Sequence, residues 1–88
     1  MKRYNLIFKG RVQAVGFRYK ALMLANELNL TGNVHNLYDG DVEVNIQGSK
    51  QYINVFIEKL NKDKFIRIDD ILIKEIDLIE GEEEFNVI

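Results

Sequence analysis

Apolar residues recur at every second position in some stretches of the chain and at every third or fourth position in others. The order of these two kinds of stretch is the feature that most constrains the fold. From Arg3 to Lys9 apolar and polar residues alternate, which is typical of a half-buried strand, and we expect Gly10 to end that strand. From Phe17 to about Asn29 apolar residues return every three or four positions, as on one face of an amphipathic helix. Asparagine tolerates the left-handed conformation that ends many helices, so the helix should stop at Asn29.

The middle of the chain predicts a β-hairpin. Residues 34–38 and 41–47 are strand-like runs, and the dipeptide Asp39-Gly40 between them favours a tight turn because both residues accept positive φ. In the second run, apolar Val42, Val44 and Ile46 alternate with polar Glu43, Asn45 and Gln47. We therefore expect one face of this strand to be buried and the other to be solvated.

The second half of the chain again shows a helical pattern followed by a strand-like pattern. Ser49 is a candidate N-cap for a second helix that ends near Asn61, with a buried stripe of Ile53, Phe56, Ile57 and Leu60. Residues 69–78 form another strand-like run, residues 80–84 an acidic turn expected to be solvated, and residues 85–88 a possible edge strand. The order strand, helix, strand, strand, helix, strand predicts an α+β split βαβ sandwich, with two helices on one face of an antiparallel sheet and the other face solvated.

Composition excludes many catalytic chemistries. The 88 residues are 47% hydrophobic and 30% charged, with no proline, and no linker or repeat divides them, so we expect a single domain over residues 1–88. Without cysteine there is no disulfide, thiol nucleophile or thiolate ligand, and a single histidine excludes a multi-histidine metal site. We therefore expect no metal and no cofactor.

Charge and hydropathy narrow the expected partners and location. A net charge of −2 with mixed signs argues against nucleic-acid binding, which needs clustered basic residues. No apolar run is long enough for a membrane span or a signal peptide, and the absence of cysteine suits a reducing compartment. A cytoplasmic protein without membrane partners is expected, and its charged surface favours a monomer.

The stretch from Gly10 to Arg18 is the candidate functional segment. A glycine-punctuated loop before a helix points unpaired backbone N–H groups at one spot, where the helix dipole adds roughly half a positive charge. A phosphate fits such a loop, and Arg18 could add a bidentate contact to its oxygens. A purely structural turn with an exposed arginine has the same spacing, so the pattern alone leaves both interpretations open.

The segment GRVQAVGFR at positions 10–18, with Tyr19, TGNVHN at 31–36 and DGDVE at 39–43, closely resembles the acylphosphatase family. All but one of the residues from Gly10 to Arg18 match the usual run of that family, and the resemblance covers most of the chain. It implies a ferredoxin-like βαββαβ fold. It also implies an enzyme that hydrolyses small acyl phosphates by metal-independent water attack, giving a carboxylate and inorganic phosphate, with inorganic phosphate as a competitive inhibitor.

The resemblance implies roles for two side chains and one loop. Arg18 matches the arginine that grips the phosphoryl group in the family, and Asn36 matches the asparagine that orients the attacking water. The backbone N–H groups of the loop would cradle the phosphate. This phosphate-binding loop consists of Gln13, Ala14, Val15, Gly16 and Phe17, together with Arg18.

Two departures from the family pattern bear on these expectations. Ala14 stands where the family usually has glycine, and a positive φ there would cost alanine about 1–2 kcal/mol and could displace the cradle. Asn33 and His35 replace an aromatic and a basic residue of the second motif. Strand alternation places His35 on the face opposite Asn36, so we expect it to be exposed or paired rather than catalytic.

A non-catalytic phosphate-binding or regulatory module of the same fold is the competing interpretation. Such a module would keep Arg18 and the loop without requiring Asn36. An RNA-binding version would need aromatic side chains on the exposed strand face, where the sequence offers Glu43, Asn45 and Gln47. The physiological acyl phosphate stays unspecified, because the expected site grips only the phosphoryl end.

Overall fold

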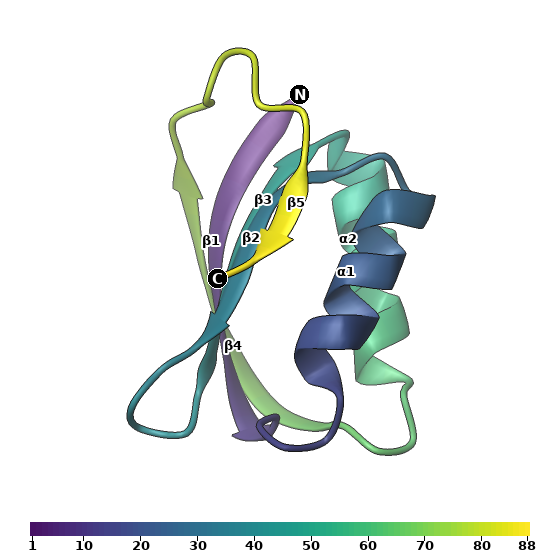
Figure 1. Cartoon of the computed structure of the whole chain (residues 1–88), viewed down its shortest axis with the longest axis vertical. Helices are drawn as coiled ribbons and strands as arrows, with labels where there is room; N and C mark the ends of the chain where they lie inside the picture. Colours follow the sequence, from purple (N-terminus) through teal and green to yellow (C-terminus); the bar gives the residue numbers. More distant parts are fainter.

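The computed structural model of the chain describes residues 1–88, which form two helices and one five-stranded mixed sheet (Figure 1). The elements in chain order are β1 (Lys2–Arg11), α1 (Phe17–Glu27), β2 (Thr31–Asn36), β3 (Val42–Gly48), α2 (Lys50–Asn61), β4 (Arg67–Ile76) and β5 (Phe85–Val87). Figure 1 shows α1 and α2 side by side. Neither helix has the length and apolar character needed to cross a bilayer.

The sheet has the strand order β4-β1-β3-β2-β5 and is not purely antiparallel, so that part of the prediction is wrong. β4, β1, β3 and β2 pair antiparallel, whereas β5 lies parallel to β2. β5 runs parallel to β2 because the chain crosses one end of the sheet after β4. Ile76 leaves the sheet beside Arg3, at the end where Thr31 begins β2, and the chain crosses that end to the opposite edge. β5 then starts at the same end as β2 and must run in the same direction.

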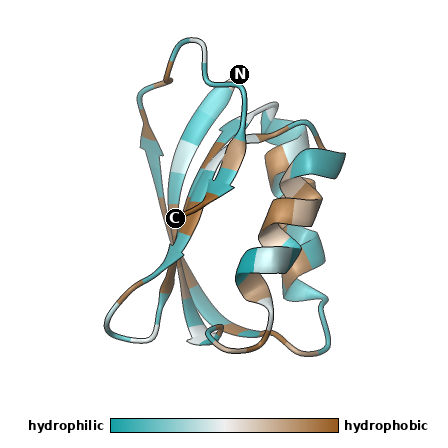
Figure 2. Cartoon of the chain, in the orientation of Figure 1, coloured by the Kyte–Doolittle hydropathy of each residue, from teal (hydrophilic) through white to brown (hydrophobic).

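The core is the layer between the sheet and the helices. The predicted apolar face of β3 is confirmed, because Val42, Val44 and Ile46 are fully buried. Ile53, Phe56 and Leu60 of α2 are buried as well, while Ile57 is only partly so. Figure 2 shows hydrophobic and hydrophilic segments alternating along both helices, as expected for helices that each bury one face.

Three strands have boundaries that differ from the sequence prediction. β4 spans Arg67–Ile76, two residues earlier at each end than the predicted run 69–78. β1 continues past Gly10 to Arg11, because a β-bulge at this point keeps it paired with β4. A Cβ at Gly10 would lie 2.2 Å from the carbonyl oxygen of Arg67, so only glycine fits. β2 begins at Thr31 and ends at Asn36, earlier at both ends than predicted.

The β2–β3 connection is a hairpin, as predicted, but its turn is wider. Leu37 N donates to Asp41 O at 2.8 Å, which leaves three residues in the loop. Gly40 has φ 95°, whereas Asp39 is not in the left-handed region. Instead, the Asp39 carboxylate accepts a hydrogen bond from Asp41 N at 3.0 Å, and this side-chain to backbone hydrogen bond stabilises the turn.

The helix ends agree more closely with the sequence. Asn29 has φ 55°, which confirms the left-handed residue after α1, although the helix itself ends at Glu27. Ser49 occupies the N-cap position of α2, as predicted. Its side chain makes no capping hydrogen bond, and its carbonyl oxygen accepts from Ile53 N.

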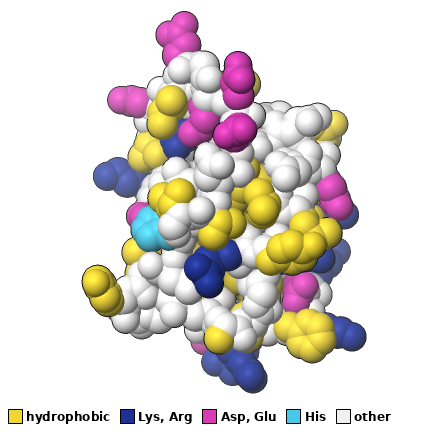
Figure 3. All heavy atoms as spheres, in the orientation of Figure 1, with side chains coloured by type: hydrophobic (Ala, Val, Ile, Leu, Met, Phe, Trp, Pro, Cys, Tyr) yellow, Lys and Arg dark blue, Asp and Glu magenta, His cyan; other side chains and the backbone are white.

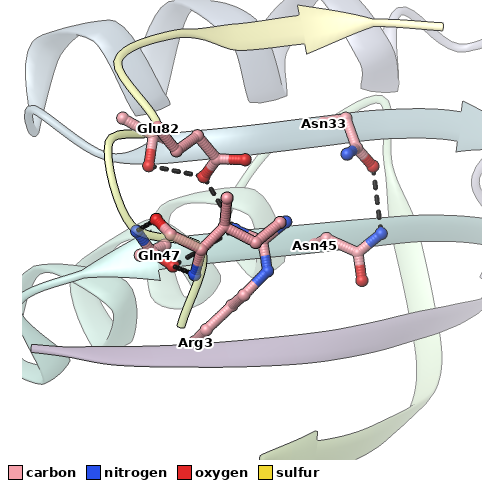
Figure 4. A network of polar contacts seen from close by, with 7 residues as sticks. Arg3, Asn33, Asn45, Gln47 and Glu82 are labelled. Atoms are coloured by element: carbon pink, nitrogen blue, oxygen red, sulfur yellow. Dashed lines mark hydrogen bonds and ion pairs between the residues drawn. The ribbon is translucent and has the colours of Figure 1, made fainter. Parts of the chain in front are cut away.

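The sheet face away from the helices is not fully solvated, which corrects a second expectation. Arg3 and Gln47 are only 3% and 5% exposed, because the segment 77–84 covers them. Figure 4 shows Glu82 reaching from this segment to Arg3, and Arg3 Nη1 donates to Glu82 Oε1 at 2.7 Å. The acidic turn is therefore partly structural, although acidic side chains do gather at that end of the molecule in Figure 3.

Candidate active site

The connection from β1 to α1 forms a loop with two left-handed residues. Val12 and Phe17 are buried in the core and anchor its two ends. Between them, Ala14 has φ 59° and Gly16 has φ 82°. Left-handed residues in a short loop turn successive N–H groups toward one concavity, which is the geometry of a backbone anion nest.

The same loop leads into an open helix N-terminus. Gly16 is the N-cap residue of α1, and no side chain caps the helix. The first turn of α1 carries no acidic residue, so nothing in that turn neutralises the positive end of the helix dipole. Free N–H groups and an unopposed dipole together favour an anion at this position.

A pocket of about 350 Å³ lies at this helix end and brings Arg18 together with Asn36. Arg18 is exposed in the first turn of α1, makes no ion pair with any carboxylate, and is the only charged residue that lines the pocket. The lining residues are Val12, Ala14, Gly16, Phe17, Arg18, Tyr19, Leu22, Asn36 and Val87. The guanidinium can therefore pair with an anion that enters the pocket.

Asn36 supplies the second polar side chain of the pocket. It is the last residue of β2, and its Oδ1 is buried without a hydrogen-bond partner. Buried acceptors are nearly always satisfied in folded proteins, because leaving one unpaired costs about 1–3 kcal/mol. Asn36 therefore lines the pocket and carries an acceptor that no protein group satisfies.

The predicted loop divides into residues that line the pocket and residues that hold the loop. Ala14, Gly16 and Phe17 line it, whereas Gln13 and Val15 do not. Val15 packs against the core. The Gln13 side chain donates from Nε2 to two carbonyl oxygens of the β2–β3 loop, Leu37 O at 2.8 Å and Asp41 O at 2.9 Å.

The β2–β3 loop is also tied to β1 by charge. Lys9 donates to the Asp41 carboxylate, and this hydrogen bond, with the negative charge of Asp41, raises the pKa of Lys9. On the sheet face away from the helices, His35 Nε2 lies 3.1 Å from Glu43 Oε1, so this histidine is paired and does not line the pocket. No group of three His, Cys, Asp or Glu side chains is placed to hold a metal ion.

Comparison with known proteins shows the family to which the chain belongs. The acylphosphatase family model matches residues 4–87. The chain belongs to the acylphosphatase family. A curated acylphosphatase of Clostridium acetobutylicum is 37% identical, over 100% of this chain and 98% of that relative. Members of the acylphosphatase family are hydrolases that act on acyl phosphates, and this chain is therefore an enzyme of that kind.

Solved acylphosphatase structures agree with the fold. The crystal structure of acylphosphatase from Bacillus subtilis superposes with a TM-score of 0.91 at 36% identity, covering 100% of this chain and 99% of the other. An acylphosphatase structure from Coxiella burnetii gives a TM-score of 0.86 at 32% identity, covering 98% and 90% of the two chains. The chain thus spans nearly the full length of these acylphosphatases.

Ala14 is the point at which this acylphosphatase departs from its family's usual loop. Its φ of 59° places Ala14 in the left-handed conformation, which costs a non-glycine residue about 1–2 kcal/mol. Its place in the pocket lining shows that the loop still turns toward Arg18. The expected conformational cost is therefore present, and the pocket forms despite it.

Four pocket residues were missed by the sequence analysis: Val12, Tyr19, Leu22 and Val87. Leu22 lies four residues after Arg18, the spacing that places two side chains on one helix face, so the helical period could have found Leu22. Tyr19 is adjacent to Arg18, and adjacent helical residues do not share a face, so this signal does not point to Tyr19. Val87 could not be found in this way. It reaches the acylphosphatase pocket only because β5 pairs parallel with β2, with Val34 opposite Val87.

Proposed function

We propose that Arg18 and the loop N–H groups bind the phosphoryl group of an acyl phosphate while Asn36 holds the water that attacks it. The observation that carries this proposal is the shared pocket, in which the unpaired guanidinium of Arg18 and the unpaired Oδ1 of Asn36 lie at an uncapped helix N-terminus. Gln13 serves the loop by tethering it, rather than by touching the phosphate.

The reaction follows from this arrangement. The water oxygen forms a bond to phosphorus, in line with the departing group, and the bond between phosphorus and the acyl oxygen breaks. The carboxylate leaves with the electron pair, and the water protons pass to the phosphate product and to solvent. Asn36 Oδ1 accepts from the water and orients its lone pair, and its amide can donate to a phosphoryl oxygen. Positioning and neutralisation of charge are what phosphoryl transfer chiefly requires, and no covalent intermediate is needed.

The finer features of the enzyme belong to the same proposal. We assign the ferredoxin-like βαββαβ order to β1 through β4, with both helices on one sheet face and β5 as an added edge strand. Residues 1–88 would act as one domain, a cytoplasmic monomer without a cofactor, nucleic acid or membrane partner. The substrates would be small molecules, because the pocket is small. Inorganic phosphate would be the product and a competitive inhibitor, because Arg18 is the only charged residue that lines the pocket.

Hydrolysis of acetyl phosphate in the presence of EDTA tests this function. We expect multiple turnovers that the chelator does not slow, and inorganic phosphate that raises KM without lowering kcat. Loss of activity with EDTA would contradict the mechanism. Phosphate binding without hydrolysis would instead favour the non-catalytic anion-binding module.

A further inference from the structure

β4 is an uncovered edge of the sheet. It is ten residues long, it ends the strand order, and it pairs only with β1 (Figure 1). Leu72 and Ile73 are neighbours in this strand, so their side chains point to opposite faces of the sheet, and they are 50% and 58% exposed. Neither face of the strand is therefore covered here. A long edge strand with exposed apolar side chains is a template for pairing with another strand.

The free backbone groups of β4 lie on alternate residues. Ile71 N donates to the carboxylate of its neighbour Asp70 at 2.9 Å rather than to β1, so this N–H faces the open edge. Backbone hydrogen bonds of an antiparallel strand alternate between its two sides, so Ile73 and Glu75 face the open edge as well. A second strand laid along β4 finds donors and acceptors at these positions.

The sequence of β4 is complementary to itself in one antiparallel register. A two-fold axis at Leu72, perpendicular to the sheet, places Leu72 opposite the same residue of a second copy. Moving outward from the axis, the opposed pairs are Ile71 with Ile73, Asp70 with Lys74, Asp69 with Glu75, and Ile68 with Ile76. Apolar residues thus oppose apolar residues along most of the strand.

Charge supports the same register. Asp70 and Lys74 lie on one face of β4, and neither makes an ion pair within its own chain. In the dimer each Asp70 lies opposite the Lys74 of the other copy, so two pairs of opposite charge form across the axis. Directly opposed residues of antiparallel strands are close enough for such pairs to stabilise the sheet.

The one pair of like charges is neutralised within each chain. Asp69 lies opposite Glu75 of the second copy, but Arg67 Nε lies 3.1 Å from Asp69 Oδ1 in the same chain. Lys2 Nζ likewise lies 3.2 Å from Glu75 Oε2. The repulsion between these two carboxylates is therefore reduced by a cation beside each.

The two neighbouring registers lack this match. An axis at Ile71 places Asp70 opposite Leu72, and an axis at Ile73 places Lys74 opposite Leu72. Either shift sets charged side chains against apolar ones and separates Asp70 from Lys74. Register in a sheet follows the pattern of its side chains, so the axis at Leu72 is the favoured one.

We propose that two copies of this chain pair along β4 in this register and form one continuous sheet. Only the edges of the two sheets meet, so the interface is small and belongs to the class of weak, transient complexes. No residue that lines the Arg18 pocket lies on β4, so the monomer stays the catalytic unit and the pairing does not depend on the proposed function.

Sedimentation equilibrium of the full chain measures the pairing. The weight-average mass rises from that of one chain at about 10 µM toward that of two chains at about 1 mM, the concentration range of weak association. Wild-type protein that keeps the mass of one chain at about 1 mM overturns the proposal, and leaves this edge to a strand of another protein or to none.

Charge reversals at the opposed pair test the register. Asp70→Lys sets two lysines against Lys74, and Lys74→Asp sets two aspartates against Asp70. Each variant alone has a dissociation constant at least about tenfold above that of the wild type, because two attractive pairs become repulsive. An equal mixture of the two variants associates as the wild type does, since each chain then supplies the charge that the other needs at both positions.

Glu83→Lys is the matched control. It changes the net charge by the same amount as Asp70→Lys, at an exposed position outside β4, and its dissociation constant stays within about threefold of the wild type. If Glu83→Lys weakens association as much as Asp70→Lys, or if the mixture fails to associate, the wild-type dimer uses another surface or register and the proposal is wrong. Association of the mixture also shows that both reversed chains are folded.

Discussion

At the scale of single residues, Ala14 and Asn36 each have a feature that lowers the stability of the folded chain. Ala14 keeps φ at 59° without the freedom of glycine, and Asn36 keeps a buried Oδ1 without a partner. Both line the pocket where the phosphate is proposed to bind. Strain and unsatisfied groups concentrate at functional sites because surrounding structure maintains them there.

Replacing Ala14 with glycine should stabilise the fold slightly. Relief of about 1–2 kcal/mol of backbone strain exceeds the roughly 0.4–1 kcal/mol lost through the greater freedom of glycine in the unfolded chain. Urea unfolding measures the difference. The matched control is Asn29→Gly, which gains less because asparagine already tolerates its φ of 55°. A less stable Ala14→Gly protein would show that the loop is not strained at this position.

Asn36→Ala should lower kcat by about 10²-fold, the scale of misplacing one reactant. Inhibition by inorganic phosphate should change much less, because the proposed role of Asn36 concerns the water. The free energy of unfolding should not fall, since the buried Oδ1 has no partner to lose. Asn33→Ala, on the other face of β2, is the control. If Asn36→Ala loses phosphate affinity and keeps its kcat, the residue binds phosphate rather than water.

At the scale of elements, the crossing from β4 to β5 joins the two edges of the sheet. Glu82 in the crossing segment accepts from Arg3 Nη1 and from Thr31 Oγ1, both at 2.7 Å, and Figure 4 shows its contact with Arg3. Glu84 O then accepts from Gly32 N, which begins the pairing of β5 with β2. The Glu82 contacts thus hold the strand that brings Val87 to the pocket.

Removal of the Glu82 carboxylate should destabilise the protein. Glu82→Ala leaves the Arg3 guanidinium buried without its carboxylate partner, at a cost of about 3 kcal/mol. Glu83→Ala is the control, because Glu83 is an exposed acidic neighbour without an ion pair. Equal urea midpoints for the two variants would contradict a structural role for this pair.

The same elements show which parts of the fold the sequence predicts. Val42, Val44 and Ile46 were placed correctly because alternation along one strand is a local pattern. The burial of Gln47 and the parallel pairing of β5 depend on where the segment 77–84 crosses the sheet, which no local pattern records. The bulge at Gly10 was read as a strand end, because the sequence marks glycine but not its pairing partner Ile68 on β4.

At the scale of the whole molecule, the fold brings a helix N-terminus and a strand end to one pocket. The loop before α1 and the last residue of β2 are separated in sequence by the whole of α1, and packing of α1 against the sheet places them together. Arg18 and Asn36 were predicted from the family resemblance. Their common pocket needed the structure, as did the apolar side chains of Tyr19, Leu22 and Val87 beside them.

The most direct test of the account is the steady-state hydrolysis of acetyl phosphate by Arg18→Ala. Arg11→Ala is the matched control, since it removes an equal charge from an exposed position outside the pocket. We predict that Arg18→Ala lowers kcat/KM by at least about 10²-fold, the scale of losing one charge-stabilising donor, while Arg11→Ala stays within a few-fold of wild type. Near wild-type turnover by Arg18→Ala would contradict the proposal that this pocket is the active site.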